Sequence, residues 1–585
     1  MKNILIINIL FLLSITIIKA QITNKNYENG ELIAQFKNTA SLENFLITNS
    51  NIFELKESVV SEWNIYLLAF DTTEYDALEL VEKFQYTDPN LIYLQLNRLA
   101  QQRNDDEVIP DDQFFNNQWA LKNDGSNNGL EGADIKGTLA WAKSQGGVTE
   151  NGDTVVVAVI DGDFFIEHPD LSKNMWKNNA EIPGNGIDDD NNGYIDDYHG
   201  WNANNNTPLN NMTGFGATHG THVAGIIGAQ GNNNIGISGI NWNVKILPIR
   251  GNPYNEANVV RAYKYVYDLR KRYNDTNGAE GAFVVATNSS FGRDREQPED
   301  FPLWCGMYDS LGMVGVLSCG ATANRNFNID NTGDIPTACP SPYLISVTNT
   351  NRRDQKNQQA GFGKNTIELG APGTDVFSTY SPTNFNPNNF YSNETGTSMA
   401  TPYVAGSIGL LYNYLCKDLI DIATEKPDSL ALIVKKLILD NVDTINGLTD
   451  ITVTNGRLNA YKPMVGADVL CEQIAIEKAE AAEKARREEI LANLEDDEFQ
   501  FFPNPVNKEN PQIKIRFKVE DENEKIVINL IDFSGKVILS EELISEVKIA
   551  NEIMLDLGFL SAGNYFLHYD KVGIEKPIIK KLIVF

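Results

Sequence analysis

A carboxylate, a histidine and a serine stand in three short, glycine-containing segments of the chain. Asp161 ends the apolar run that starts at Val155, His219 opens the string His-Gly-Thr-His-Val-Ala-Gly, and Ser398 lies in Gly-Thr-Ser-Met-Ala-Thr-Pro. A serine hydroxyl is a weak nucleophile at neutral pH, so it needs a base to take its proton and a carboxylate to orient that base. Together the three residues predict hydrolysis through an acyl-enzyme on Ser398.

The local elements that carry these residues are also predictable. Asp161 follows a buried strand, and His219 stands at a turn that leads into an apolar helix. His222, one helical turn further in, is interpreted as structural. Ser398 opens another apolar helix, in which Pro402 is tolerable near the start because the first amides lack partners anyway. Those free amides and the helix dipole would lie where an oxyanion forms.

The region 113–470 alternates apolar strand-like runs with helical stretches such as 257–273. This pattern is typical of an α/β fold, a doubly wound and mostly parallel sheet with helices on both faces. In such sheets ligand sites lie beyond the carboxyl ends of the strands, which is where Asp161 stands. The expected strands are 154–160, 244–249, 283–287, 313–319 and 343–347.

The three segments, in the order Asp161, His219, Ser398, resemble the active-site signatures of the subtilisin-like serine proteases (subtilases), and the resemblance covers 113–470. It implies that Asn324 donates to the oxyanion, although Ala323 stands where the family usually has glycine; Asn326 is a competitor, and a simple turn asparagine is the plain alternative. It also implies that the backbone of Ser290, Phe291 and Gly292 pairs with an extended substrate.

The N-terminal part divides into a leader and a small unit. Residues 1–20 are typical of a signal peptide, with a membrane anchor as the alternative. Residues 21–103 predict a small α/β unit with strands at 31–36, 63–70 and 91–96 and a helix at 75–84, which resembles the family's inhibitory propeptide. The polar segment 101–112 is interpreted as a linker and cleavage region.

Charge and cysteine content exclude some partners. The formal net charge of −30 over 585 residues disfavours a nucleic-acid partner, which would call for a basic face. The five cysteines allow at most two disulfides, their spacing fits no metal motif, and their pairing is not readable from sequence. We expect structural or inert roles for all five.

An acidic loop at 185–197 carries a pattern of oxygen ligands. Asp188, Asp190 and Asn192 stand at alternating positions before a glycine, as in a calcium loop, but position twelve is His199 rather than glutamate. A complete EF-hand is therefore excluded, and Asp197 or its neighbour Asp196 could supply a further ligand. Calcium and a solvated acidic turn remain the two interpretations.

The C-terminal part predicts a charged linker helix at 472–497 and a small β-sandwich-like module at 500–585. The expected strands of the module are 512–519, 525–531, 536–539, 565–569 and 578–585. Its Phe501-Phe-Pro-Asn-Pro505 and its terminal Lys580-Lys-Leu-Ile-Val-Phe585 resemble the sorting domain of the type IX secretion system. A sandwich that binds carbohydrate or protein is the alternative.

These features lead to one functional hypothesis and two rivals. We expect a secreted or surface-attached serine endopeptidase whose partners are protein or peptide substrates, its own propeptide and the type IX secretion machinery. The rivals are a catalytically dead adhesion or scaffold protein and a serine esterase. The order of the three residues disfavours the α/β-hydrolase arrangement, which runs Ser–Asp–His.

Overall fold

The computed structural model divides after Asp105 into two compact units. The predicted signal peptide and the part of the predicted linker up to residue 106 lie outside the described residues. The structure describes residues 27–84, 91–98, 107–209, 217–251, 255–383, 388–492, 499–506, 511–517, 526–543, 552–571 and 578–584. Within these ranges, no helical stretch reaches the length and hydrophobicity that spanning a bilayer requires.

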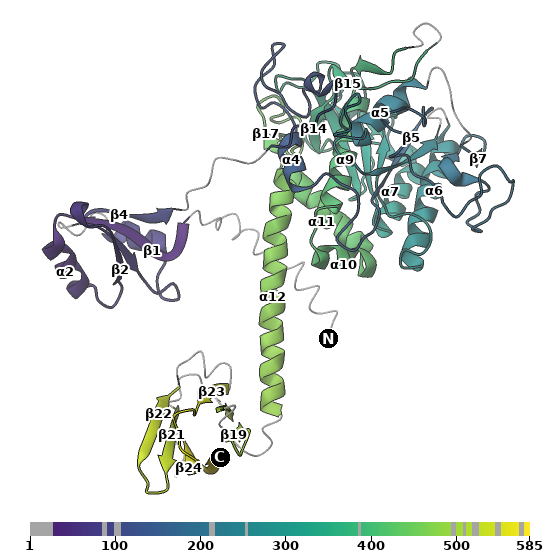
Figure 1. Ribbon diagram of the computed structural model, residues 1–585. Helices are drawn as coiled ribbons and strands as arrows, with labels where there is room; N and C mark the ends of the chain where they lie inside the picture. Colours follow the sequence, from purple (N-terminus) through teal and green to yellow (C-terminus); the bar gives the residue numbers. More distant parts are fainter. Residues whose placement is uncertain are drawn as a thin grey trace. The chain divides into compact units, whose positions relative to one another are not determined.

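The N-terminal unit is a four-stranded antiparallel sheet with two helices (Figure 1). Alternate residues of its central strand, Leu32, Ala34 and Phe36, are buried with Phe45 and Phe84 of the helices, so one face of the sheet is covered. The strand order is β2-β3-β1-β4. The elements are β1 (Tyr27–Phe36), α2 (Thr39–Thr48), β2 (Glu54–Val60), β3 (Ile65–Ala69), α3 (Ala77–Phe84) and β4 (Leu91–Arg98).

The sequence predicted three of the four strands, β1, β3 and β4, and the helix α3, but it missed α2 and β2. Every residue of β2 from Glu54 to Val59 is exposed, because β2 lies at the edge of the sheet. An edge strand with no buried face shows no alternation of apolar and polar residues, so the usual sequence pattern is lacking.

The sheet of the central domain is mostly parallel, as predicted, with antiparallel pairs only at its two edges. Its strand β5 lies between β8 and β9, so neighbours on the two sides of β5 come from different parts of the chain. The strand order is β17-β18-β14-β13-β11-β9-β5-β8-β6-β7. The strands are β5 (Val156–Asp161), β6 (Trp201–Asn202), β7 (Thr207–Pro208), β8 (Lys245–Arg250), β9 (Val284–Ser289), β11 (Leu317–Ala321), β13 (Leu344–Thr350), β14 (Leu369–Pro372), β17 (Asp443–Thr444) and β18 (Gly456–Arg457).

Helices cover both faces of this sheet (Figure 1), which confirms the doubly wound α/β class. Along β5, Val157 and Val159 belong to one apolar core, while Val156, Ala158 and Ile160 belong to the other. Because both faces of β5 are buried, every position of the strand favours an apolar residue, which explains its unbroken apolar sequence. The helices are α4 (Gly137–Lys143), α5 (Thr218–Gly228), α9 (Thr397–Tyr412), α10 (Lys417–Glu425) and α11 (Pro427–Asp440) on one side, and α6 (Glu256–Asp275) and α7 (Pro302–Met313) on the other.

Two boundaries in this domain differ from the prediction. The strand expected at 313–319 begins only at Leu317, because Met313 ends α7 and Gly315 turns the chain with a φ of +95°. The helix expected at 472–497 begins ten residues earlier, as α12 (Lys462–Ala492), because its first turns bury Met464 and Ala467 in the core. Residues 493–497 of the prediction lie outside the described residues.

Four of the five cysteines form two disulfides, Cys305–Cys339 and Cys416–Cys471. The first joins α7 to the segment after β11, and the second joins the start of α10 to α12. Cys319 lies buried in β11 as a free thiol, and burial raises its pKa well above the ordinary value. This distribution agrees with the expected structural or inert roles.

The C-terminal module is a sandwich of two antiparallel sheets, β19-β20-β23 and β22-β21-β24-β25. Apolar side chains from both sheets form one core, in which Phe499 stacks on Tyr569 with ring centroids 5.2 Å apart. The short strands β19 and β23 were not predicted from the sequence. The strands are β19 (Phe499–Phe502), β20 (Gln512–Phe517), β21 (Ile526–Asp532), β22 (Val537–Glu542), β23 (Glu552–Asp556), β24 (Gly563–Lys571) and β25 (Ile578–Val584).

Candidate active site

Asp161 is the last residue of β5, at the point where the strand order of the sheet reverses. Its side chain is buried, and both carboxylate oxygens lie 2.9 Å from Nδ1 of His219. The backbone N–H of Gly162 donates to the same carboxylate at 2.7 Å. Reversal of strand order opens a crevice at the carboxyl ends of the strands, which is where folds of this type bind their ligands.

His219 is the second residue of α5, and its side chain is 45% exposed. The next residue must be small: a Cβ at Gly220 would lie 2.5 Å from the carbonyl oxygen of Asp163. The negative charge of Asp161 raises the pKa of His219, and burial opposes the rise. The bond to Asp161 keeps the proton on Nδ1, which leaves Nε2 as the acceptor of the neutral ring.

His222 lies further along α5 and is fully buried. Its Nε2 is 3.1 Å from the carbonyl oxygens of both Val376 and Ser392. Burial lowers the pKa of His222 to about 3, so the ring is neutral at physiological pH. The contacts tie α5 to the hairpin of β15 (Val376–Thr379) and β16 (Tyr391–Glu394), as a structural histidine would.

Ser398 is the second residue of α9, which packs directly against α5. It exchanges two hydrogen bonds with Ser290: its Oγ donates to the Ser290 carbonyl at 3.2 Å, and the Ser290 hydroxyl donates to the Ser398 carbonyl at 2.8 Å. Pro402, four residues on, has no N–H for the Ser398 carbonyl, so the Ser290 hydroxyl takes the place of the missing helix bond. Within the described residues, the backbone N–H of Ser398 has no protein acceptor.

Asn324 lies beside the start of α9, three residues after β11 ends. Its Oδ1 accepts the backbone N–H of Thr397 at 2.9 Å. Because the Thr397 N–H can bond only to an acceptor, the side-chain amide of Asn324 must present its oxygen there. Its Nδ2 is then left to donate elsewhere. Asn326, the competitor, is exposed and accepts from Lys356 Nζ at 3.1 Å.

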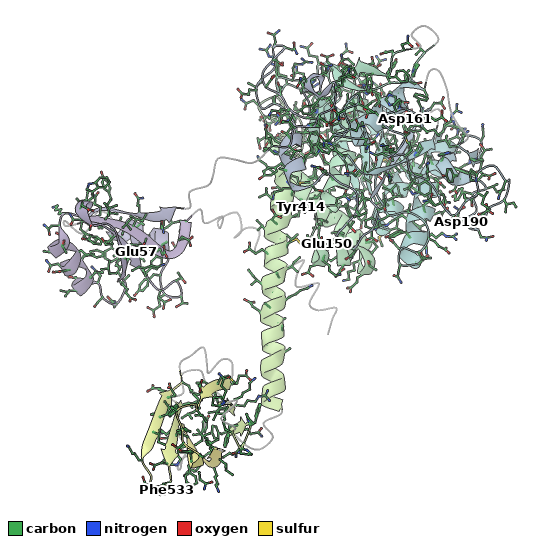
Figure 2. The ribbon with its side chains drawn as sticks, viewed as in Figure 1. Glu57, Glu150, Asp161, Asp190, Tyr414 and Phe533 are labelled. Carbon is green, nitrogen blue, oxygen red and sulfur yellow. A yellow bond between two sulfur atoms is a disulfide. The ribbon has the colours of Figure 1, made fainter. Side chains whose placement is uncertain are left out.

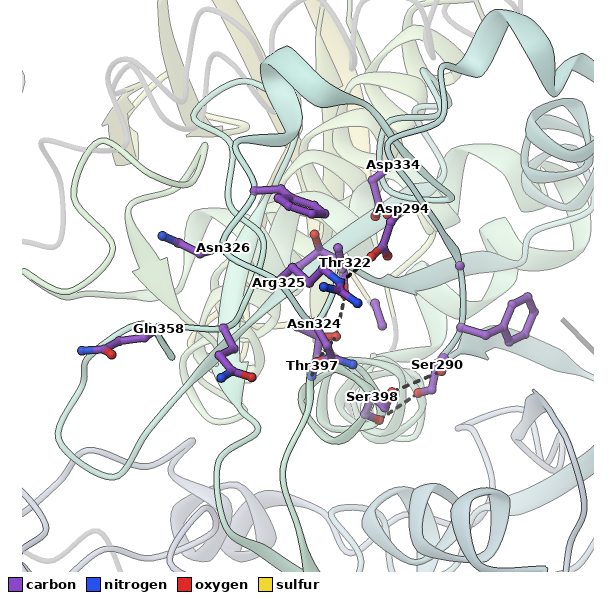
Figure 3. A pocket seen from close by; sticks show the side chains of 16 residues that line it. Ser290, Asp294, Thr322, Asn324, Arg325, Asn326, Asp334, Gln358, Thr397 and Ser398 are labelled. Carbon is purple, nitrogen blue, oxygen red and sulfur yellow. Dashed lines mark hydrogen bonds and ion pairs between the residues drawn. The ribbon is translucent and has the colours of Figure 1, made fainter. Parts of the chain in front are cut away.

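The segment 290–292 follows the carboxyl end of β9 and lines the same cavity as Ser398 and Asn324 (Figure 3). Ser290 is buried, while Gly292 is exposed. A Cβ at Gly292 would lie 2.3 Å from the carbonyl oxygen of Ile335, so only glycine fits here without a shift. The sequence-predicted residues Ser290, Phe291, Gly292, Asn324 and Ser398 therefore meet at one cavity.

The acidic loop lies at the edge of the same domain, away from Asp161 (Figure 2). Carboxylate oxygens of Asp188, Asp190 and Glu181 lie within 4.8 Å of one another. Asn192 donates its side-chain amide to Asp190 and Asp197. Sequence reasoning missed Glu181, because it stands seven residues before Asp188 and outside the alternating pattern.

Asp197 is fully buried and has a different environment from the rest of the loop. Its carboxylate accepts from Asn178, Asn192 and Tyr265, at 2.7, 3.1 and 2.7 Å. Burial raises the pKa of Asp197 to about 6. Its oxygens hold the loop together, whereas Glu181, Asp188 and Asp190 form the group that could share a cation.

An Asp–His pair at the switch point of a doubly wound sheet, with a serine at the start of a neighbouring helix, defines a serine hydrolase type of site. The model of the family described as the subtilase family matches residues 152–457. The chain therefore belongs to the subtilase family, which is a family of serine proteases. A second family, described as a secretion system C-terminal sorting domain, matches residues 500–585, so the chain is a subtilase with a type IX sorting tail.

Relatives and solved structures match mainly the protease part. The chain is 32% identical to subtilisin-like protease 1 of Plasmodium falciparum in an alignment 282 residues long that covers 44% of this chain and 37% of that one. It is 27% identical to thermitase of Thermoactinomyces vulgaris over 338 residues, 56% of this chain and 92% of thermitase. A protease from Pseudoalteromonas arctica has a TM-score of 0.44 at 20% identity, with 62% of this chain and all of that chain covered.

Proposed function

We propose that the chain is a secreted endopeptidase that hydrolyses peptide bonds of proteins through an acyl-enzyme on Ser398. The observation that carries the proposal is the contact of His219 Nδ1 with both oxygens of Asp161, each at 2.9 Å. With its Nδ1 proton directed at Asp161, the ring offers the lone pair of Nε2 as the base. The packing of α5 on α9 keeps this base near the helix that carries Ser398.

The reaction would proceed by two acyl transfers. Ser398 Oγ turns from the Ser290 carbonyl, gives its proton to His219 Nε2 and attacks the substrate carbonyl carbon. The imidazolium then protonates the leaving amine, and the C–N bond breaks to leave an ester on Ser398. Water gives a proton to His219 and attacks the ester, and Ser398 regains its proton as the carboxylic acid leaves.

The oxyanion of each tetrahedral intermediate would be held by Nδ2 of Asn324 and by the backbone N–H of Ser398. Asn324 is suited to this role because its Oδ1 accepts the Thr397 N–H, which leaves the Nδ2 amide to donate to a ligand beside the start of α9. The positive end of the α9 dipole adds to the stabilisation. The backbone of 290–292 supports an extended substrate strand along the rim of the cavity.

Labelling with a serine-reactive fluorophosphonate tests the nucleophile directly. The secreted protein should be labelled and should cleave casein, and Ser398→Ala should lose both properties. Ser310→Ala, which removes a hydroxyl bonded to the Gly306 carbonyl in α7, serves as the matched control and should keep both. No labelling of the wild type would favour the dead scaffold, and cleavage of esters but not of peptides would favour the esterase.

We propose that residues 21–103 act as a propeptide that this protease removes itself. The support is that the described residues between Tyr27 and Arg98 form a compact unit of their own with a separate core. Mass spectrometry of the secreted protein should find a mature N-terminus after residue 103 in the wild type. The Ser398→Ala protein should keep the segment, and its removal from that variant would show that another protease does the processing.

The sorting domain directs the chain to a secretion system, and we propose that the type IX machinery exports it and removes residues 500–585. A chain that ends before residue 500 should accumulate in the periplasm, whereas the full chain should reach the medium or the cell surface. Fractionation with an antibody to the protease domain would measure both outcomes and would also separate release from attachment.

We propose calcium as a structural ion in the acidic loop, held by Glu181, Asp188 and Asp190. The donor set fits, because hard cations such as calcium prefer carboxylate oxygens and these three lie within 4.8 Å of one another. Calorimetric titration and thermal melting with and without chelator test it, with Asp188→Asn as the variant. Asp309→Asn, at an exposed position of α7, is the control. No heat and no shift in the wild type would end the proposal.

A further inference from the structure

A cavity of about 820 Å³ lies beside Ser398, at the carboxyl ends of β9 and β11. Ser398, Ser290 and Asn324 line one part of it, next to the atoms that would carry out the attack (Figure 3). The space between Ser398 and Asn324, where the attacked carbonyl would lie, is continuous with this cavity, so the cavity is within reach of the side chain of that residue. The lining of the cavity therefore bears on which residue precedes the cleaved bond.

Two aspartates line the same cavity from a two-stranded ribbon. Asp294 belongs to β10 (Arg293–Asp294) and Asp334 to β12 (Asp334–Ile335), and the two residues are directly opposed in the antiparallel register. Directly opposed residues of such a pair share one face, and like charges there are destabilising unless a cation compensates them. Figure 3 shows both carboxylates at the end of the cavity away from Ser398.

Asp334 is 1% exposed, which is unusual for a carboxylate. It accepts the hydroxyl of Thr337. This bond orients the carboxylate and leaves part of its acceptor capacity for a ligand, since two oxygens offer about four lone-pair sites. Burial raises the pKa of Asp334 to about 8, so a cation brought beside it would favour its ionised form.

The charges around the cavity do not balance when both carboxylates are ionised. Among the described residues that line it, Arg325 is the one cation against Asp294 and Asp334. Its Nε lies 3.4 Å from Asp294 Oδ2, and its side chain is 71% exposed. An exposed pair of this kind is weak. Arg325 can therefore pair with Asp294 or leave the cavity at a small cost in free energy. In either case, no cation among the described lining residues pairs with Asp334.

We propose that this cavity binds the lysine or arginine side chain of the residue whose carbonyl carbon Ser398 attacks, with Asp334 as the residue that selects the positive charge. The inference rests on the proposed function, because it needs Ser398 to be the nucleophile. It adds the substrate class: the protease cleaves after basic residues. A buried carboxylate next to a bound ammonium or guanidinium forms a charge-assisted hydrogen bond, which a neutral side chain cannot replace.

The test uses the mature secreted protein and peptides that differ only in the residue before the cleaved bond: lysine, arginine, norleucine, phenylalanine or glutamate. Norleucine matches the stem of lysine without its charge. We expect kcat/KM for lysine and arginine to exceed that for norleucine by about 10- to 100-fold, the range of a hydrogen bond to a charged group. Glutamate should be the poorest.

Three variants separate charge recognition from a structural role. Asp334→Asn keeps the shape and an acceptor for the Thr337 hydroxyl, and it should lower the lysine-to-norleucine ratio of kcat/KM by about tenfold or more while norleucine cleavage is largely kept. Arg325→Gln removes the competing cation and should keep or raise the ratio. Asp309→Asn, at an exposed position of α7, should change nothing.

A preference of the wild type for phenylalanine or norleucine over lysine would overturn the inference and leave the proposed function intact. An Asp334→Asn protein that loses activity equally on every peptide would also overturn it, because that result assigns Asp334 to the loop fold alone. A wild type that cleaves no peptide and takes no fluorophosphonate label would instead overturn the proposed function, and this inference with it.

Discussion

Ser290 and Ser398 bind each other through both their hydroxyls and both their carbonyls, at 2.8 and 3.2 Å. The bond from the Ser290 hydroxyl exists because Pro402 leaves the Ser398 carbonyl without its helical donor. Asn288 in turn donates to the Ser290 hydroxyl at 3.0 Å. The end of β9 and the start of α9 are thus joined at the residue that we propose as nucleophile.

Replacement of Ser290 by alanine should destabilise the protein and slow catalysis together. The buried Ser398 carbonyl would lose its donor, which costs about 1–3 kcal/mol in the free energy of unfolding. Chemical denaturation and kcat/KM on one peptide measure the two effects. Ser310→Ala, which also removes a hydroxyl from a helix carbonyl, should cost much less, because that bond is exposed. Equal losses in the two variants would contradict the role of the Ser290–Ser398 link.

Activity should fall on the acid side as His219 becomes protonated, because only the neutral ring can take the Ser398 proton. Asp161 raises the pKa of His219 above the ordinary value of 6.5, so the acid limb of kcat/KM should lie above that pH. Asp161→Asn removes the negative charge that raises the pKa of His219. It should therefore shift the acid limb of kcat/KM to lower pH, besides lowering kcat. A pH profile of both proteins measures this, and an unchanged limb in the variant would count against the pair.

The contact between His219 and Asp161 should also make the free energy of unfolding depend on pH. Because the pKa of His219 is raised in the folded state, the folded state binds more protons than the unfolded state between the two pKa values. The contribution of His219 to the free energy of unfolding is therefore fully present below its pKa in the unfolded state. It is lost as pH rises through its pKa in the folded state. Denaturation of the wild type and of His219→Gln at several pH values should show a difference that shrinks as pH rises through this window.

Two variants of Asn324 separate its donor from its acceptor. Asn324→Asp keeps an oxygen for the Thr397 N–H but loses the amide donor, whereas Asn324→Ala loses both. Both should lower kcat by about 10²–10³, a magnitude already known for such a donor in subtilisin itself. Only Asn324→Ala should lower the free energy of unfolding, by about 1 kcal/mol, because the Thr397 N–H loses its cap. Near-normal kcat in Asn324→Asp would point to Asn326 instead.

The disulfide Cys416–Cys471 should stabilise the end of the protease domain. It closes a loop with a sequence separation of 55, and its loss through Cys416→Ser should lower the free energy of unfolding by about 2–4 kcal/mol. Thermal melting with and without reductant measures the effect. Cys319→Ala, which removes the free buried thiol, should show the same response to reductant as the wild type.

Much of the site was predictable because its parts are local. The unbroken apolar run of β5, the glycine beside His219 and the glycine–serine start of α9 each reflect a constraint within a few residues. The pocket lining was not predictable in this way. Asp294 and Asp334 are 40 residues apart in sequence, and they meet only because β10 pairs with β12. Glu181 likewise comes close to Asp188 and Asp190 only in the folded chain, because the intervening loop folds back on itself.

The sequence by itself determined the class of fold, the order of its modules and the residue types at the three active-site segments, because burial patterns and turn residues act over short distances. Only the tertiary structure decided which cysteines pair, that Ser290 completes the helix bond missing at Pro402, and that Asp334 lies in the cavity beside Ser398. Those relationships depend on the register of strands and the packing of helices far apart in the chain, which no local pattern records.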